Sequence, residues 1–335
     1  MRNSNSPQGD IAMNSLRALA LWLALFPPGA SAASKDDYPQ RPLRLVVPVP
    51  PGGAGDFTGR LVGAKLAEAL GQNVVVENRG GAAGVIATEF VSQAAPDGYT
   101  FLLSSSTTHG IGPVLYRKLP YDAQKNFTHI GLIATVPAVM AVNQSVPVHS
   151  VKEFVALAKA KPGALLFGSS GSGGPPHLMG ELFKAVTGAP ITHVPYKGSG
   201  PGVTDLLSGQ VQLMIVPQPV VIGHVRAGRL KALAVTSLKR SSVLPSLPTV
   251  AEAGLAGYDV SAWYGVVAPA GTPAEIVGRL NAEIARVLGA PETRDQLLKL
   301  GAEPSPNTSM EFAGYIRSET LKWAKVIKDS GARVD

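Results

Sequence analysis

A stretch rich in glycine and proline, Pro48–Arg60, contains the residues best suited to hold a small ligand. It follows the apolar run Leu43–Val47 and precedes a segment with helical character, so a strand should end and a helix begin here. The first four N–H groups of a helix lack partners within the helix, and the helix dipole adds partial positive charge. Glycine also lets the backbone approach a ligand closely. The stretch therefore predicts a loop that binds a small anion.

Hydroxyl side chains follow two other predicted strands at the position where each strand would end. Hydroxyls and free backbone N–H groups can solvate a carboxylate without a fixed positive charge. Serine and threonine are also common in ordinary loops, so a structural role is an equal alternative for any one of them. The candidate hydroxyls are Ser104, Ser105 and Ser106 in the first loop and Ser169, Ser170 and Ser172 in the second.

Two ionisable residues in these loops have both a structural and a functional interpretation. Asp56 is interpreted first as the N-cap of its helix, and second as a polar contact to a ligand or a bridging water. His177 is the one histidine of six that falls in a loop of interest. A capping or packing role is favoured for it over catalysis.

The motifs of common enzymes are absent from the sequence. There is no cysteine nucleophile, no G-x-S-x-G motif around a serine, and no G-K-[ST] of a phosphate-binding loop. The histidines show neither the HExxH motif nor another paired metal-ligand spacing. We therefore expect a binding protein without a cofactor or metal, and keep an exported enzyme as an alternative.

The strongest competing interpretation is a dinucleotide-binding site. Gly53, Gly55 and Gly59 lie between a predicted strand and helix, where such a fingerprint belongs. Glu77 would end the next strand, near the position of a ribose-binding acid. The spacing nevertheless departs from G-x-G-x-x-G, and Asp56 would place negative charge against a pyrophosphate. An exported protein also meets little nicotinamide cofactor.

The N-terminal residues have the order of a secretory signal peptide. Arg17 precedes the apolar run Ala18–Phe26, and the small residues Ala30–Ala32 follow. The apolar run is shorter than the roughly 20 residues that span a bilayer. We predict cleavage after Ala32 and export to a bacterial periplasm, with Met13 as an alternative start.

The composition supports a mature chain without stable membrane insertion. The absence of cysteine excludes disulfides and a lipidated cysteine, and later apolar runs are too short to cross a membrane. The formal net charge is +7, but the basic residues are scattered, which argues against a nucleic-acid surface. The chain length suggests two domains.

The order of predicted elements indicates an α/β fold with two similar halves. Strand and helix alternate twice as βαβαβ, which is typical of a parallel sheet, and in such sheets ligands bind beyond the carboxyl ends of the strands. The expected connections between halves lie near residues 135–143 and 260–267. The predicted strands are 43–47, 74–77, 100–104, 165–168, 191–194 and 213–216, and helices near 274–288, 292–300 and 310–329 follow.

Capping-box patterns of the form S/T-x-x-E mark the starts of several other predicted helices. They begin at Ser150, Thr249, Thr272 and Thr308. We interpret these residues as structural.

With these motifs in hand, the sequence resembles the periplasmic solute-binding proteins of tripartite tricarboxylate transporters, also called Bug receptors. The resemblance covers essentially the whole mature chain. It rests on Pro48–Arg60, Leu115–Asp122, His193–Pro201, Leu247–Gly254, Trp263–Gly265 and Ala268–Pro273.

The resemblance implies a two-lobe periplasmic-binding-protein (Venus flytrap) fold, each lobe a mostly parallel sheet flanked by helices. Expected boundaries are residues 1–32 for the signal peptide, 33–138 with 263–335 for lobe 1, and 139–262 for lobe 2. It also implies carboxylate ligands held by backbone amides, hydroxyls and water. The resulting site adds Pro51, Gly52, Gly53, Ala54, Asp56, His177, Tyr196 and Pro217 to the serines.

One position departs from the family pattern. Relatives often carry an acid where this chain has Val216–Gln218, so this end of the pocket should be less acidic and amino-acid ligands are disfavoured. We expect a monomeric receptor that closes on a small organic carboxylate and delivers it to the membrane subunits of the transporter. A ligand-sensing receptor for a signalling partner is the second hypothesis.

Overall fold

The computed structural model describes Met1 and residues 38–332. The predicted signal peptide, apart from Met1, lies outside the described residues. Within the described part of the chain, no helix is both long and apolar enough to cross a membrane.

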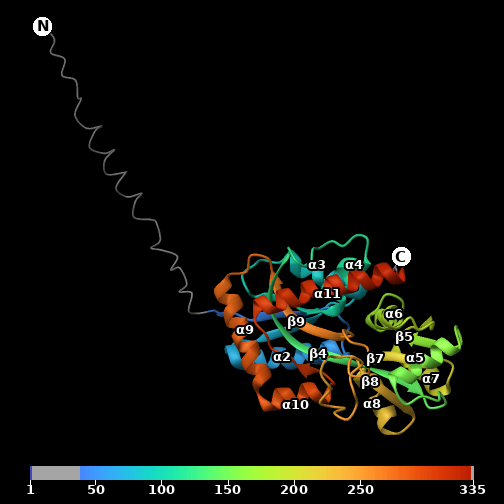
Figure 1. The fold of residues 1–335 in the computed structure, drawn as a ribbon. Coiled ribbons are helices and arrows are strands. Elements are labelled where there is room, and N and C mark those ends of the chain that lie inside the picture. The colour runs from blue at the N-terminus through green and yellow to red at the C-terminus, as the bar shows by residue number, and fades with distance from the viewer. Residues whose placement is uncertain (2–37, 333–335) are drawn as a thin grey trace. The chain divides into compact units, whose positions relative to one another are not determined.

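Strands and helices alternate along the body of the chain (Figure 1). The strands are β1 (Leu43–Val47), β2 (Val74–Asn78), β3 (Thr100–Ser105), β4 (Phe127–Asn143), β5 (Leu166–Ser169), β6 (Thr192–Pro195), β7 (Leu213–Pro217), β8 (Leu230–Val235), β9 (Ser261–Pro269) and β10 (Glu303–Pro304). The helices are α2 (Ala54–Leu70), α3 (Val85–Ser92), α4 (Gly112–Leu115), α5 (Val151–Ala160), α6 (Pro175–Thr187), α7 (Ser199–Ser208), α8 (Gln218–Arg226), α9 (Ala274–Gly289), α10 (Pro291–Lys299) and α11 (Ser309–Ser330). Two short turns, the 3₁₀ turn η2 (Ala82–Gly84) and the π-helical turn η3 (Ser106–Ile111), complete the set.

The described strands form one curled sheet in the order β2-β1-β3-β9-β4-β7-β5-β6, with β8 and β10 paired to β4. β1 pairs in parallel with β2 and β3, and β5 pairs in parallel with β6 and β7. The two predicted βαβαβ units are therefore present. The long strands β4 and β9 join them in antiparallel fashion, which makes each half of the sheet mixed.

Strand β4 runs through both halves of the sheet. Its residues 127–137 pair with β9, whereas Ala138–Val142 pair with β7. We call β1, β2, β3, β9, β10 and the start of β4 the first half-sheet, and β5 to β8 with the end of β4 the second half-sheet. A single strand thus carries the chain from one half-sheet to the other, and β9 returns it.

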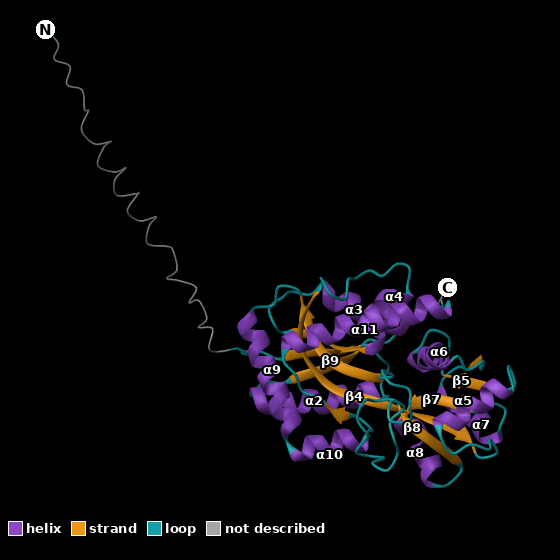
Figure 2. Cartoon of the chain, viewed as in Figure 1, coloured by secondary structure: helices purple, strands orange, loops and turns teal. Residues whose placement is uncertain are grey.

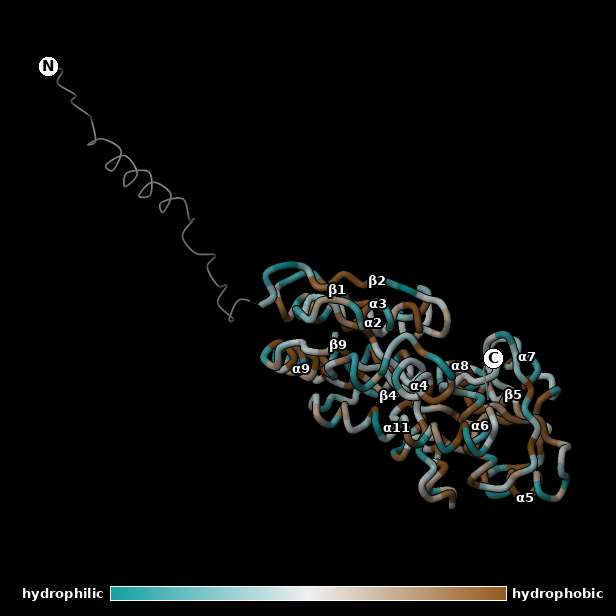
Figure 3. Tube along the Cα trace, turned by 90° about the horizontal axis from the view of Figure 1, so that it is seen from above, coloured by the Kyte–Doolittle hydropathy of each residue, from teal (hydrophilic) through white to brown (hydrophobic). Residues whose placement is uncertain are grey.

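Helices cover both faces of the first half-sheet (Figure 2). α2 packs with α9 and α10 on one face, while α3 and α11 lie across the sheet from them. Figure 3 shows the same arrangement from above, with the chain coloured by hydropathy. Because four of the five residues of β1 are buried, its run of leucine and valine needs cover on both faces.

Helix α11 packs with the cores of both half-sheets. Its Phe312 and Ile316 join Val46, Leu102 and Trp263 of the first half-sheet in one hydrophobic cluster. Its Trp323 and Val326 instead lie in the cluster built by residues of the second half-sheet and its helices. The helix therefore ties the two cores together along its length.

The capping-box predictions have mixed outcomes. At Thr308 both hydrogen bonds of the box are formed, and at Ser150 the hydroxyl accepts from the N–H of Glu153. Thr249 and Glu252 also form both bonds, but the prediction of a helix there is wrong because the segment is a turn. Thr272 is not a cap, since its hydroxyl donates to the carbonyl of Pro269 and α9 follows Pro273.

Candidate ligand-binding site

A cleft of about 400 Å³ lies where the loops after β1, β3, β5 and β7 meet. These loops leave the carboxyl ends of parallel strands, where ligands of α/β proteins usually bind. The cleft is lined by Pro48, Val49, Pro50, Gly81, Ala83, Gly84, Ser105, Ser106, Thr107, Thr108, Ser170, Pro175, Pro176, Ser199, Pro217, Ala262 and Tyr264. No described Lys, Arg, Asp or Glu lines it, so any charge on a ligand would be met by hydroxyls and backbone dipoles.

The loop before α3 forms part of the first wall and has an unusual backbone. Ala82 and Ala83 both have positive φ, 45° and 53°, and Gly84 follows at 92°. A Cβ on Gly84 would lie 2.7 Å from the Thr108 Cγ2 atom and 3.0 Å from the Pro48 Cβ atom. Glycine therefore permits both the conformation and the close contact of three cleft loops.

The end of β3 supplies the hydroxyls of the first wall. The N–H of Ser105 donates to the Thr108 Oγ1 atom at 3.1 Å, and the N–H of Thr108 donates to the Ser105 Oγ atom at 3.4 Å. This reciprocal cap begins the π-helical turn η3. Beneath it His109 is fully buried, and burial followed by the charge of His129 lowers its pKa to about 3. The turn is thus supported by a neutral imidazole.

The second wall comes from the amino ends of two helices and the ends of two strands. Ser170 follows β5, and Pro175 and Pro176 begin α6. Ser199 begins α7, and Pro217 ends β7. Both helices begin on this side, and the positive end of a helix dipole favours an anionic group. Proline at the first two positions of α6 removes two of its N–H donors, so the dipole and the neighbouring hydroxyls contribute more there than free N–H groups do.

Two stacked histidines support the loop that carries Ser170. The rings of His177 and His193 lie 3.9 Å apart and nearly parallel. The Nδ1 atom of His177 accepts from the N–H of Gly173 at 3.0 Å, and the Nε2 atom of His193 lies 2.7 Å from the Ser169 Oγ atom. Burial lowers the pKa of both, and that of His193 falls to about 4 with the charges of His177 and Lys184 also contributing. The loop is therefore fixed by neutral imidazoles.

The loop Pro51–Asp56 is organised by the Asp56 carboxylate. That carboxylate accepts from the N–H of Gly52 at 2.9 Å, from Asn78 Nδ2 at 2.8 Å, and pairs with Arg60 Nε at 2.9 Å. The N-cap of α2 is Gly53, so the interpretation of Asp56 as the N-cap is wrong; Asp56 is the third residue of the helix. It acts as an internal anion for the loop.

Tyr196 also has an internal partner. Its hydroxyl donates to the Asp205 carboxylate at 2.7 Å, and its ring lies 3.2 Å from the position that a Cβ on Gly168 would take. Burial, followed by the hydrogen bond and charge of Asp205, raises its pKa to about 12. In this structure the side chain anchors α7 to the end of β5.

The structure brings four of the predicted residues together in the cleft: Ser105, Ser106, Ser170 and Pro217. The remaining predicted residues do not line it, and their role in binding stays a prediction. Ser104 and Ser169 are fully buried, whereas Ser172 and residues 51–54 are exposed. The others outside the lining are Asp56, His177 and Tyr196.

Several lining residues were missing from the sequence-based list. Gly81 and Gly84 belong to the glycine-rich stretch Gly80–Gly84. Ser199 lies within His193–Pro201, one of the stretches that carry the family resemblance, so all three residues had a signal in the sequence. Tyr264 and Ala262 lie on β9, where the crossing strand passes the cleft. Their contribution depends on the pairing of β9 with β3, opposite Ser105, which the sequence does not reveal.

The fold and cleft are those of a two-lobe α/β solute-binding protein. A sequence model of the "Tripartite tricarboxylate transporter family receptor" (TctC) matches residues 58–332, and the chain belongs to this family. It is 39% identical to the protein BugT of Bordetella pertussis over 96% of this chain and 100% of that one.

Solved structures agree with this assignment. The chain is 41% identical to the adipate-bound Rpa4515 of R. palustris, with a TM-score of 0.76 and coverage of 89% of this chain and 100% of that one. It is 34% identical to MatC of Rhodopseudomonas palustris with bound malate, with a TM-score of 0.71 and coverage of 87% and 100%. The protein is therefore a solute-binding receptor, and its relatives are receptors rather than enzymes.

Proposed function

We propose that this receptor binds a small organic carboxylate in the cleft between its two half-sheets and closes on it. The observation that carries the proposal is the lining itself: Ser105–Thr108 on one wall and Ser170 with Ser199 on the other, without a fixed charge among the described residues. Hydroxyls and backbone N–H groups from opposite walls can each hold one oxygen of an anionic ligand. Two solved relatives, with adipate and with malate, carry ligands of this class.

Closure would bring the two walls together by a hinge motion. β4 changes partner between Pro137 and Ala138, and β9 begins at Ser261, opposite Pro137. These positions support lobe boundaries at 33–138 with 263–335 for lobe 1 and 139–262 for lobe 2, although the end of α11 packs with the second core. The ligand favours the closed state by its higher affinity for that state. In the closed state the loop Pro51–Asp56 and Tyr196 are proposed to approach the ligand.

The receptor is proposed to act in the periplasm, after cleavage behind Ala32, and to deliver the carboxylate to the membrane subunits of a tripartite tricarboxylate-type transporter. The family membership supports this partner. Deleting the gene should abolish uptake of the bound carboxylate by whole cells. Unchanged uptake, with binding by the purified protein intact, would instead favour the signalling role.

A thermal-shift screen tests the ligand class. Mono-, di- and tricarboxylates, including adipate and malate, are compared with sugars and nucleotides on the purified mature chain. A ligand at 100 times its dissociation constant adds about 2.7 kcal/mol to the free energy of unfolding, which raises the melting temperature by about 5 °C in a chain of this size. We expect such a rise with at least one carboxylate. A rise with a sugar or a nucleotide alone would refute the carboxylate proposal.

A further inference from the structure

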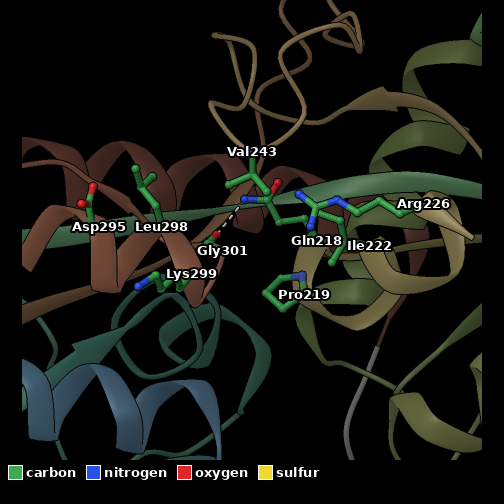
Figure 4. Close-up of a pocket in the computed structure, with 9 residues that line it drawn as sticks. All are labelled: Gln218, Pro219, Ile222, Arg226, Val243, Asp295, Leu298, Lys299 and Gly301. Atoms are coloured by element: carbon green, nitrogen blue, oxygen red, sulfur yellow. Dashed lines mark hydrogen bonds between the residues drawn. The ribbon is translucent and has the colours of Figure 1, made fainter.

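A second and larger hollow, of about 520 Å³, lies between α8 and α10 (Figure 4). Its lining shares no residue with the candidate cleft. One wall is formed by α8 and the loop residue Val243, which belong to the second half-sheet. The other wall is formed by α10 and Gly301, which belong to the first. We call this hollow the α8–α10 groove.

The floor of the groove is a close-packed contact between the two half-sheets. Gln218 is fully buried; its Nε2 donates to the carbonyl of Gly301 at 2.8 Å, and its Oε1 accepts from the Ser241 hydroxyl at 2.8 Å. Gly301 has φ of +70°, and a Cβ there would lie 2.5 Å from the Pro219 Cγ atom. Both ends of the amide are thus held by protein groups.

The chemistry of the walls combines an apolar surface with an excess of positive charge. Pro219, Ile222, Val243 and Leu298 supply the apolar surface. Arg226 and Lys299 are opposed by one acid, Asp295, and no ion pair joins any of the three to another described residue. In Figure 4 the guanidinium of Arg226 extends over Gln218 toward the middle of the groove, while Asp295 lies at the far end.

These features match one class of ligand. An unpaired guanidinium beside apolar side chains favours an anionic group attached to an apolar body, because the body removes apolar surface from water while the anion contacts the cation. With Asp295 opposing a second negative charge, one negative charge fits better than two or three. The volume accommodates a molecule of two or three rings.

We propose that the α8–α10 groove is a second binding site, for a small organic monoanion whose charged group contacts Arg226 and whose apolar body lies against Ile222, Val243 and Leu298. The site is separate from the proposed carboxylate cleft. The two are nevertheless linked, because Gln218 in the floor directly follows Pro217 of the cleft and the groove walls belong to different half-sheets. If lobe closure changes the affinity of the groove for its anion, the anion and the cleft ligand would each change the affinity of the other by the same factor.

The test uses 1-anilinonaphthalene-8-sulfonate, a monoanion with two aromatic parts whose fluorescence rises in apolar surroundings. We expect saturable binding of one molecule to the mature chain, weakened at least tenfold by Arg226→Glu. Arg229→Glu is the matched control, since Arg229 is exposed nearby and lies outside the groove. Equal affinities of these two variants, or the absence of saturable binding, would overturn the proposal.

A second measurement needs no variant. Amide chemical shifts of the wild-type protein, recorded by NMR during the same titration, should change for Gly301 and for the Gln218 side chain. The same shift changes should occur when the probe is titrated into protein whose cleft is already saturated with its carboxylate. Shift changes confined to Ser105–Thr108 would show that the probe occupies the cleft and would contradict a separate site. Stoichiometric displacement of the bound probe by the carboxylate would contradict it as well, because the two ligands would then compete for one site.

Discussion

The loops after β1 and β5 occupy corresponding places in the two half-sheets, yet they are held by opposite means. After β1, the charged carboxylate of Asp56 accepts from the N–H of Gly52 and from Asn78. After β5, the neutral rings of His177 and His193 hold the backbone of Gly173 and the Ser169 hydroxyl. The first loop therefore contains its own anion, while the second has none.

This difference determines what each loop offers a ligand. In the first loop a donor is already taken by Asp56, and the residues that reach the cleft are Pro48, Val49 and Pro50. In the second loop the histidine anchors bind the N–H of Gly173 and the hydroxyl of Ser169. Ser170 is not one of their partners, and it lines the cleft. On the first side the hydroxyls come instead from Ser105–Thr108. Two glycine-rich loops at corresponding places thus have different roles because different groups satisfy their backbones.

The largest expected effect separates Ser170 from its neighbour Ser172. Ser170 lines the cleft, so Ser170→Trp should fill it and weaken carboxylate binding by at least 100-fold. Ser172 is exposed outside the lining, so Ser172→Trp should keep the affinity within about threefold. Both affinities are measured by isothermal titration calorimetry. Similar losses in the two variants would show that the loop as a whole, and not the side facing the cleft, determines binding.

Asp56→Asn tests the charged anchor of the first loop. Hydrogen bonds to a neutral side-chain amide are weaker than hydrogen bonds to a carboxylate, so the free energy of unfolding should fall by about 1–3 kcal/mol. Urea denaturation at pH 7 measures this loss. The matched control is Asp97→Asn, which changes an exposed carboxylate in another loop and should have a smaller effect.

The same variant also has a pH signature. Burial raises the pKa of Asp56, but the hydrogen bonds from Gly52, Arg60 and Asn78 outweigh it and the pKa is lowered. The stabilisation is therefore present above the unfolded pKa of about 3.9 and is lost as the pH falls through the lower folded value. The difference between wild type and Asp56→Asn should be constant from pH 5 to 7 and shrink only below about pH 4. A difference that disappears already at pH 5 would argue against the carboxylate as the anchor.

His193→Gln tests the neutral anchor of the second loop and should have the smallest effect. Because the folded pKa is about 4, the unfolded chain takes up a proton first as the pH falls below about 6.5. Undiminished, this shift would change the free energy of unfolding by about 1.8 kcal/mol between pH 7 and pH 5. His193 is only half-buried, so solvent screening reduces the effect, and the unfolding free energy of the wild type should fall by about 1 kcal/mol more than that of the variant. His149→Gln, at an exposed histidine outside the cleft, should follow the wild type. The measurement is the free energy of unfolding by urea at several pH values between 7 and 5. If this free energy depends on pH in the same way for wild type and His193→Gln, the neutral anchor is contradicted.

Much of the fold follows from local sequence signals. The strands of both βαβαβ units lie within one or two residues of their predicted positions, because each is a short apolar run bounded by glycine or proline. Gly71, Gly188 and Gly209 end their helices in the left-handed conformation, as expected for glycine at this place. The single strand β4 that joins the half-sheets was foreseen only in its second part, since pairing with β9 extends it back to Phe127.

The candidate site was less predictable, for reasons that lie in tertiary structure. Ala82 and Ala83 have positive φ values, and alanine gives no local signal for that conformation. From the sequence, the N–H of Gly52 is expected to be free for a ligand and Asp56 to cap the helix, whereas in the structure the two bind each other. The α8–α10 groove has no sequence signature, because its two walls are brought together only by the folded chain.

The crystal structure of the complex with the carboxylate that most raises the melting temperature tests the central proposal most directly. We predict the carboxylate in the cleft, with its oxygens within hydrogen-bond distance of donors in Ser105–Thr108 on one wall and of Ser170 or Ser199 on the other. A carboxylate bound only at Arg226 in the α8–α10 groove, or one paired with a lysine or arginine elsewhere, would contradict it.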